Sequence, residues 1–375
     1  MKILFLQNIG NTYGGVWQVN KTVGEALIKK GYDVTILSIR ENKVAYELEY
    51  DKKMHVETLN TIDAWQTYSW TEVINEIKKM KIATSLKYAK HRLHNNKTLK
   101  QDKKRLKEYL DKLKPDYIVS SQYQLLDLIP TNYLDKTYHE QHCSFKESWS
   151  HKGTRKALLK YNNKVKFIWL CNGSMNEAIN KGLNNSYCIY NAVRFEAKEK
   201  ADIINNKKLI TIARLSHEKR IDKMIDIVEE VFRDKKYHNW KLEIWGDGDE
   251  YDYIKKLITS PQIKLMGVTN NPQKNFLSAS INLVTSDFEG FSLSILEANE
   301  CGVPTIAYDF GESSNEEILN GKTGFIAKNK DDYVNKLKSL MDDKELLIKL
   351  SNECKKYNDN FKIKNIINEW IKLFK

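Results

Sequence analysis

The sequence predicts an α/β protein with two doubly wound domains, each built on a parallel sheet. Short apolar runs typical of strands alternate with helical patterns, and this alternation stops once, at the polar stretch 194–208, and then restarts. A chain of 375 residues with 41% hydrophobic residues is long enough for two separate cores. We therefore expect a first domain over residues 1–193 and a second over residues 194–359.

The first half opens with a strand, a glycine-containing loop, a helix and a second strand. Val19, Val23 and Leu27 recur at helical spacing, and Gly31 is expected to end this helix. This order is typical of a parallel sheet in which a helix connects neighbouring strands. The strands expected in this half are Lys2–Gln7, Asp33–Ser38, Asp116–Gln122, Lys136–Gln141, Lys166–Cys171 and Ser186–Val193.

The second half repeats this organisation. A helix is expected within Lys219–Lys235, because Ile221, Met224, Ile225 and Val228 fall on one face. The strands expected here are Lys208–Leu215, Lys241–Gly246, Gln262–Gly267, Ile281–Ser286 and Val303–Asp309. Ligands of doubly wound sheets bind beyond the carboxyl ends of the strands. Residues that follow strands are therefore the first candidates for a site: Gly14, Gly15, His142, Arg214 and Glu289.

The net charge of +12 is concentrated in one segment. Lys78–Lys114 holds 14 lysine and arginine residues against three acidic ones, about eleven net charges. Its apolar residues recur at helical spacing, which predicts one or two basic amphipathic helices. Two interpretations stay open, a solvated surface face and a patch for anionic lipid. A nucleic-acid site is disfavoured, because no nucleic-acid motif is present and aromatic residues do not interleave with the charges.

Composition restricts the class of protein further. No apolar run is long enough to span a bilayer, and the first apolar run is too short for a signal peptide. The five cysteines are scattered and form no CxxC pair, which indicates reduced thiols and not a disulfide or zinc framework. We expect a cytoplasmic protein, with the basic segment as its possible contact with the inner face of a membrane.

The most informative segment is "DFEGFSLSILEANECGVP", residues 287–304. Two carboxylates, Glu289 and Glu297, are separated by seven residues, and a helix is expected to open between them. A helix start with backbone N–H groups near Gly290, Phe291, Ser292 and Leu293 attracts anions. An alternative is that Ser294 and Glu297 form a capping box, in which case Glu297 has only a structural role. Arg214 and Lys219 are suited to phosphate oxygens, and surface charge is the alternative for both.

These motifs together resemble those of retaining glycosyltransferases of the GT-B fold, in glycosyltransferase family 4. "ARLSHEKRID" is similar to the Arg-Leu…Lys stretch, residues 287–309 to the Glu-x7-Glu segment, and "HEQHCSF" to the histidine after a first-domain strand. The resemblance is dense over Leu209–Ile326 and sparse before it. It implies two Rossmann-like domains that face each other across a cleft. It also implies that the last helix, residues 360–375, packs back on the first domain.

The resemblance also implies roles for single residues. Glu289 would accept hydrogen bonds from hydroxyls of the donor sugar, and Glu297 from the ribose. His142 would lie beside the donor sugar, with His139 as a rival and a structural histidine as the alternative. Gly14 and Gly15 would contact phosphate or acceptor, unless they form a plain turn. The donor-binding residues then expected are Gly14, Gly15, Gly290, Phe291, Ser292, Leu293, Glu297 and Val268, and the catalytic ones are Arg214, Lys219, Glu289 and His142.

The implied activity is transfer of a hexose or N-acetylhexosamine from a nucleotide sugar, UDP-linked by family habit. The acceptor would be a hydroxyl of a glycan, lipid-linked or cell-envelope polymer. We expect no cofactor and no metal, because Arg214 and Lys219 supply the positive charge and "GDGD" directly follows a strand, although Asp247 and Asp249 resemble a metal-binding pair. The alternatives are a sugar-nucleotide epimerase of the same fold and a catalytically silent binding or stabilising subunit.

Three further segments carry expectations. "FGESSNEEIL" lacks the proline that many family members have there, so its loop is expected to differ in shape. The final segment places apolar residues from Ile363 to Phe374 in one helical stripe, as a core-facing helix requires. Trp65, Tyr68 and Trp70 are expected to pack in the core, or else to line an acceptor or membrane surface.

Overall fold

The computed structural model describes residues 1–9, 14–40, 49–60, 74, 77 and 82–375. Contacts divide the chain into two compact units. The first contains 1–141, 153–168 and 183–185, and the second contains 142–152, 169–182 and 186–375. The domain boundary predicted after Val193 and the packing of residues 360–375 on the first domain stay predictions. Trp65, Tyr68 and Trp70 lie outside the described residues.

The first sheet has seven strands in the order β3-β2-β1-β4-β5-β6-β7. The pairs β1–β2, β2–β3, β1–β4 and β4–β5 are parallel, as the alternation of strands and helices predicts. Strand β3 was not predicted, because "HVETLN" is largely polar. The strands are β1 Lys2–Ile9, β2 Asp33–Arg40, β3 His55–Asn60, β4 Tyr117–Ser120, β5 Thr137–Gln141, β6 Lys166–Trp169 and β7 Ser186–Cys188.

The helices of this half connect its strands. Helix α1 begins directly after Gly14 and buries Val19, Val23 and Leu27, and Gly31 follows its end in a left-handed conformation with φ 85°. Residues 82–113 of the basic segment form one continuous helix, α3, of 32 residues. The helices are α1 Gly15–Lys29, α3 Ile82–Leu113, α4 Tyr123–Leu126, α5 Phe145–Ser150, α6 Lys152–Tyr161 and α7 Asn172–Asn180, with a 3₁₀ turn η1 at Thr131–Lys136.

The second sheet has six strands in the order β10-β9-β8-β11-β12-β13, and all its pairs are parallel. This is the strand order of a doubly wound sheet, and its order reverses between β8 and β11. The predicted strands are confirmed, and β13 is an addition. They are β8 Lys208–Ile212, β9 Lys241–Trp245, β10 Ile263–Gly267, β11 Ile281–Val284, β12 Thr305–Tyr308 and β13 Gly324–Ala327.

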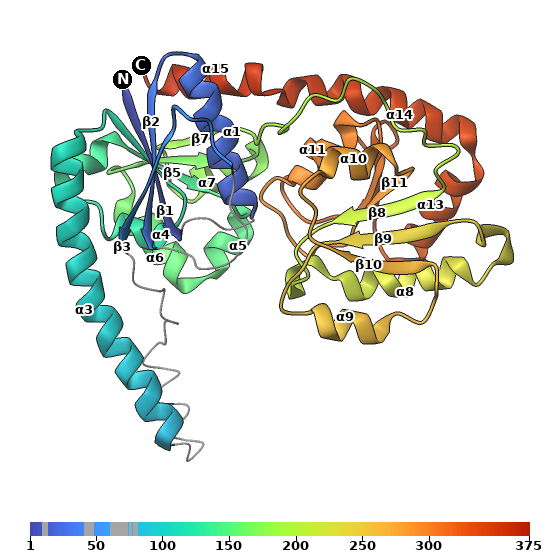
Figure 1. The fold of residues 1–375 in the computed structure, drawn as a ribbon, viewed down its shortest axis with the longest axis horizontal. Helices are drawn as coiled ribbons and strands as arrows, with labels where there is room; N and C mark the ends of the chain where they lie inside the picture. The colour runs from blue at the N-terminus through green and yellow to red at the C-terminus, as the bar shows by residue number, and fades with distance from the viewer. Residues whose placement is uncertain (10–13, 41–48, 61–73, 75–76, 78–81) are drawn as a thin grey trace. The chain divides into compact units, whose positions relative to one another are not determined.

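Helices cover both faces of this sheet, with α8 and α9 on one side and α10 and α11 on the other (Figure 1). The four apolar residues predicted for the face of α8 are buried, from Ile221 to Val228. The helices are α8 Ile221–Phe232, α9 Tyr251–Leu257, α10 Pro272–Leu277, α11 Leu293–Glu300, α12 Ser314–Glu317, α13 Lys330–Asp342, α14 Lys344–Asn358 and α15 Ile363–Leu373. The 3₁₀ turns are η2 His217–Lys219, η3 Lys235–Tyr237 and η4 Asp359–Phe361.

The two sheets confirm the predicted fold class, two Rossmann-like α/β domains. In the part of the chain that the structure describes, no helix is long and apolar enough to cross a membrane.

Candidate functional site

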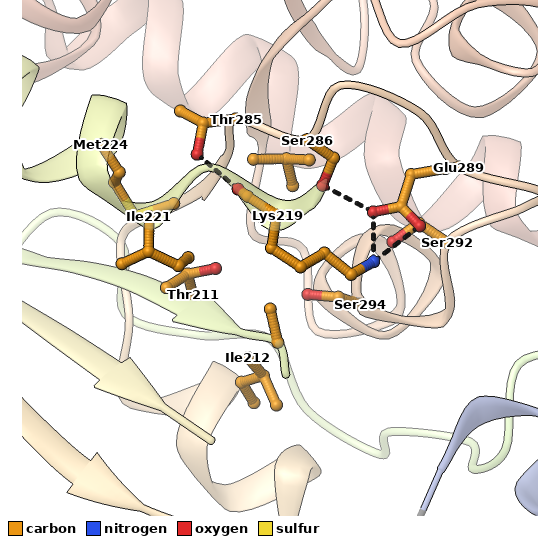
Figure 2. Close-up of a pocket in the computed structure, with 12 residues that line it drawn as sticks. Thr211, Ile212, Lys219, Ile221, Met224, Thr285, Ser286, Glu289, Ser292 and Ser294 are labelled. Carbon is orange, nitrogen blue, oxygen red and sulfur yellow. Dashed lines mark hydrogen bonds and ion pairs between the residues drawn. The ribbon is translucent and has the colours of Figure 1, made fainter. Parts of the chain in front are cut away.

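The candidate residues of the second unit gather where its strand order reverses, at the carboxyl ends of β8 and β11. Lys219 belongs to the turn η2 after β8, and Glu289 belongs to the loop between β11 and α11. Both line a small cavity of about 20 Å³ (Figure 2). Such a cavity has room for about one water molecule and none for a sugar. A larger ligand would therefore have to lie outside this cavity.

Lys219 and Glu289 form an ion pair. The lysine Nζ lies 2.6 Å from Oε1 and 2.8 Å from Oε2 of the carboxylate, and the hydroxyl of Ser286 donates to Oε1 at 2.7 Å (Figure 2). The two side chains are 20% and 12% exposed. The hydroxyl of Thr285 donates to the backbone carbonyl of Lys219 at 3.0 Å and fixes the turn from β11. The site thus holds Lys219 and Glu289 in contact, with both side chains partly exposed to solvent.

Arg214 differs from Lys219 in its environment. Its side chain is 69% exposed, and its guanidinium donates to Glu218 at 2.6 Å and to the hydroxyl of Ser216 at 3.2 Å. Burial opposes the ionisation of Glu218, but hydrogen bonds from Ser216 and its own backbone, together with Arg214, lower its pKa overall. Arg214 is therefore held by one neighbouring carboxylate on a flexible, solvent-exposed stem and does not line the cavity of Figure 2.

The "GDGD" stretch supports the loop that carries Arg214. A Cβ on Gly246 would lie 1.8 Å from the carbonyl oxygen of Ala213, and one on Gly248 would lie 2.3 Å from that of Leu215. Only glycine permits this close approach of the two backbones. Oδ1 of Asp247 accepts the N–H of Gly248 at 2.8 Å. Among the described residues, no group of three or more His, Cys, Asp or Glu side chains is arranged to hold a metal ion.

The start of α11 brings Gly290 and His142 together. A Cβ on Gly290 would lie 2.4 Å from the carbonyl oxygen of His142, so the two backbones are in direct contact. Helix α11 begins at Leu293 with Ser292 as its N-cap. Phe291 is buried, and its carbonyl accepts a hydrogen bond from Asn191 at 2.8 Å. The side chain of Phe291 thus packs in a core, and its backbone is the part left to contact a ligand.

Glu297 lies inside α11 and forms an ion pair with Arg194. The glutamate is buried, at 1% exposure, and the arginine side chain is 20% exposed. Because α11 begins at Leu293, Ser294 lies within the helix and cannot be the N-cap of a capping box with Glu297. The capping-box alternative is therefore wrong. Arg194 was not predicted as a site residue, since no local pattern links it to a residue 103 positions later.

The structure separates the two rival histidines. His139 is fully buried in β5, and its ring nitrogens lie 3.1 Å from the carbonyl oxygen of Ser120 and 3.0 Å from Oε1 of Gln141. It is thus a satisfied core histidine. His142 is half-buried in the loop after β5. Its backbone contact with Gly290 makes it the histidine of this site.

Three further candidates are Gly14, Gly15 and Val268. Gly14 is the N-cap of α1 in the first unit, Gly15 begins that helix, and their predicted phosphate contact stays a prediction. A Cβ on Gly14 would collide with the ring of Trp17 at 2.6 Å. Val268 is half-buried directly after β10, and its contact with the donor also stays a prediction.

Sequence reasoning missed a segment in which three carboxylates each meet the start of a helix. Glu312 accepts the N–H of Lys146 in α5 at 2.9 Å. Glu316 accepts those of Asn172 and Gly173 in α7, at 3.0 and 2.8 Å. A carboxylate stabilises a helix start because it satisfies free N–H groups and opposes the helix dipole.

The third acidic side chain of this segment, on α12, contacts the start of α11. Glu317 accepts the N–H of Ser292 at 2.7 Å and is fully buried. This is the segment "FGESSNEEIL", whose missing proline was its only signal in the sequence. One short stretch of chain thus contacts the starts of three helices, α5, α7 and α11.

Comparisons with known proteins identify several that are similar to this chain. Residues 193–361, which contain Lys219, Glu289 and Glu297, match the family model described as glycosyl transferases group 1. This part of the chain is therefore similar to group 1 glycosyl transferases. An uncharacterized glycosyltransferase of Haemophilus influenzae is 25% identical over 386 residues, which cover 98% of this chain and 97% of that protein.

Other similar proteins are longer than this chain or share fewer identical residues with it. A poly(ribitol-phosphate) alpha-N-acetylglucosaminyltransferase of Staphylococcus aureus is 26% identical over 62% of this chain, and the match spans 48% of that protein. Among solved structures, a variant of S. aureus TarM in complex with fondaparinux, alpha-GlcNAc-glycerol and UDP has a TM-score of 0.78 at 17% identity, with both chains fully covered. The pneumococcal O-GlcNAc transferase GtfA in complex with UDP and GlcNAc has a TM-score of 0.75 at 13% identity, covering 99% and 98%. These two similarities establish the shared fold alone.

Proposed function

We propose that this chain is a retaining glycosyltransferase that transfers a hexose or N-acetylhexosamine from a UDP-linked sugar. The acceptor is a hydroxyl of a glycan, lipid-linked or cell-envelope polymer. The observation that carries this proposal is the Lys219–Glu289 ion pair beside the start of α11, with His142 in contact with Gly290. UDP in the TarM and GtfA structures and the polymer named for the S. aureus relative support the donor and acceptor classes.

We propose that the donor diphosphate replaces Glu289 as the partner of Lys219. Its oxygens bind Lys219 and the N–H groups at the start of α11, because both attract anions. Glu289 is then released to accept hydrogen bonds from hydroxyls of the donor sugar. Arg214 swings on its exposed side chain from Glu218 to the same diphosphate. Glu297 accepts the ribose hydroxyls, and Arg194 holds it in place.

Positive groups at the leaving phosphate are proposed to be the main source of catalysis. Charge grows on this phosphate as the bond to the sugar breaks, and preformed cations and N–H groups stabilise that charge. The acceptor hydroxyl attacks from the same face and gives its proton to the leaving phosphate, so the configuration is retained. We propose that Lys219 and Arg214 take the part of a metal ion, and that no cofactor is needed.

A panel of nucleotide sugars tests the donor. The purified protein is incubated with UDP-glucose, UDP-N-acetylglucosamine, UDP-galactose and their GDP counterparts, with and without a polyol-phosphate polymer, and nucleotide release is followed. Release from one UDP-sugar, accelerated by the polymer and with an α-linked product by NMR, is expected. Isomerisation of the sugar nucleotide without release would indicate an epimerase. Donor binding without turnover would indicate a silent subunit.

We also propose that α3 attaches the enzyme to an anionic membrane surface, where lipid-linked acceptors are found. Two apolar side chains near its first turn, Ile82 and Leu86, are each 66% exposed. Exposed lysines follow further along the helix, among them Lys100, Lys103 and Lys104. Apolar and basic side chains on one exposed helix suit insertion at a lipid interface and attraction to its charge.

A further inference from the structure

Glu317 is a buried carboxyl group at the start of the helix that the donor is proposed to use. It is fully buried in α12, and its Oε2 accepts the N–H of Ser292 at 2.7 Å. In the described part of the chain, no lysine or arginine forms an ion pair with it. A buried carboxylate without a cation is costly, and such a group tends to keep its proton.

The groups that face Glu317 favour the protonated form. Burial raises the pKa of Glu317 to about 8, and the like charge of Glu289 adds to this. The N–H of Ser292, the hydroxyl of Ser313 and Lys219 oppose the shift without cancelling it. Lys219 is already bound to Glu289 (Figure 2), so its charge is largely neutralised there.

The other titratable neighbours of Glu317 belong to three elements. Glu316 precedes it on α12 and receives hydrogen bonds from the start of α7. The Cys171 thiol, at the N-cap of α7, and the Tyr357 hydroxyl, on α14, both have raised pKa values, chiefly through burial and also through the charge of this glutamate pair. None of these groups supplies a positive charge to Glu317.

We propose that Glu317 is a positioning residue that holds the start of α11 as a neutral carboxylic acid and so leaves it open to a diphosphate. A carboxylate at this position would satisfy the helix start and repel the donor. The neutral acid fixes the Ser292 N–H through an oxygen that carries no full charge. This inference rests on the proposed nucleotide-sugar donor.

The proposal has a consequence for donor binding. A bound diphosphate adds negative charge near Glu317 and favours its protonated form further. Where the free enzyme has lost this proton, it must take one up when the donor binds. Donor affinity therefore falls at pH values above 8.

The first test needs no ligand and compares the wild type with Glu317→Gln, which keeps a neutral acceptor for Ser292. Because the folded pKa exceeds the unfolded one, the retained proton stabilises the fold fully below about pH 4, and this stabilisation is lost as pH rises to 8. The thermal midpoint of the wild type should therefore fall relative to Glu317→Gln between pH 5 and 8. Glu312→Gln, at the start of α5, is the matched control and should follow the wild type. A constant difference between wild type and Glu317→Gln overturns the proposal.

The second test measures UDP binding by calorimetry at pH 7 and pH 8.8. The wild type should weaken by about fivefold at the higher pH and take up a proton, since a group with a pKa near 8 is then mostly ionised. Glu317→Gln should bind within about twofold of the wild type at pH 7 and change little with pH. A tenfold loss in Glu317→Gln at pH 7, or the same pH dependence in both proteins, overturns the proposed role. Failure of the wild type to bind UDP at either pH counts against the UDP donor, and the stability comparison still decides the protonation of Glu317.

Discussion

The second unit and helix α3 use charged and apolar side chains in opposite ways. Within the second unit, Lys219 contacts Glu289 and Arg194 contacts Glu297, and each of these pairs is largely shielded from solvent. On α3, the ion pair Lys104–Glu108 has a separation of 3.9 Å, with side chains 80% and 65% exposed. An exposed pair of this kind contributes little to stability. These two pairs thus lie among the candidate site residues, whereas the exposed charges of α3 are accessible to an external surface.

The apolar faces of two amphipathic helices show the same contrast. Helix α15 buries Ile366, Ile367 and Trp370. Helix α3 buries Leu106 and Leu110 near its end, but its first turns expose their apolar side chains. Both helices have apolar residues at helical spacing, so periodicity identifies a helix without revealing what covers its face. Substitutions of the buried or paired side chains of the second unit should therefore affect folding or catalysis, and substitutions of exposed side chains on α3 should affect neither.

Removing the buried apolar face of α15 is expected to have the largest effect, a loss of stability. Deletion from Ile363 onward should cost at least about 5 kcal/mol, because several large buried side chains are lost and each contributes about 2–5 kcal/mol. Denaturant unfolding and solubility measure this. Trp370→Ala should reproduce much of the loss, whereas Lys372→Ala, on the exposed face, should not. A truncated protein that stays stable but no longer binds vesicles would reverse the roles of α15 and α3.

Removal of a paired positive side chain at the candidate site should have the second-largest effect. Lys219→Ala and Arg214→Ala should each lower turnover at least about 100-fold, equivalent to about 3 kcal/mol of lost leaving-group stabilisation. Steady-state kinetics with the preferred nucleotide sugar measures this, and thermal melting checks the fold. Lys223→Ala is the control, because that lysine pairs with Asp287 outside the predicted set. Near-normal turnover in both variants would contradict the assignment.

Reversing the charge of exposed lysines on α3 should have a smaller effect than the site substitutions. The triple change of Lys100, Lys103 and Lys104 to Glu should weaken binding to anionic vesicles at least about tenfold, since each basic residue near such a surface contributes about 1 kcal/mol. Folding and turnover on a soluble acceptor should not change. The control is the charge reversal of three exposed lysines on α14 and α15, Lys344, Lys349 and Lys364. Equal loss of vesicle binding in both triple variants would show a general effect of net charge.

Chelation is expected to have no effect at all. Excess EDTA should leave turnover unchanged, because Lys219 and Arg214 are proposed to neutralise the diphosphate. Initial rates with and without EDTA test this directly. Loss of activity that manganese restores, and that Asp247→Ala abolishes, would assign a metal role to "GDGD" instead.

The sequence predicted both sheets because most of their buried strands are short runs of apolar residues. It also predicted that Glu289, Lys219 and the start of α11 lie together, since all follow neighbouring strands. It missed Arg194, Glu316 and Glu317, whose partners are 103, 144 and 25 residues away. No periodicity links such positions, because the contact exists only when the fold has formed. His139 and His142 could not be separated either, since burial decides between them.

The segment with Glu312, Glu316 and Glu317 has a consequence during protein synthesis. The amide of Lys146 in α5 donates to a carboxylate that is synthesised 166 residues later. The amide of Asn172 in α7 donates to a carboxylate that is synthesised 144 residues later. At about 5–20 residues per second, a ribosome needs roughly 7–35 seconds to make that length of chain. For that interval the nascent chain carries two helix starts without their final acceptors.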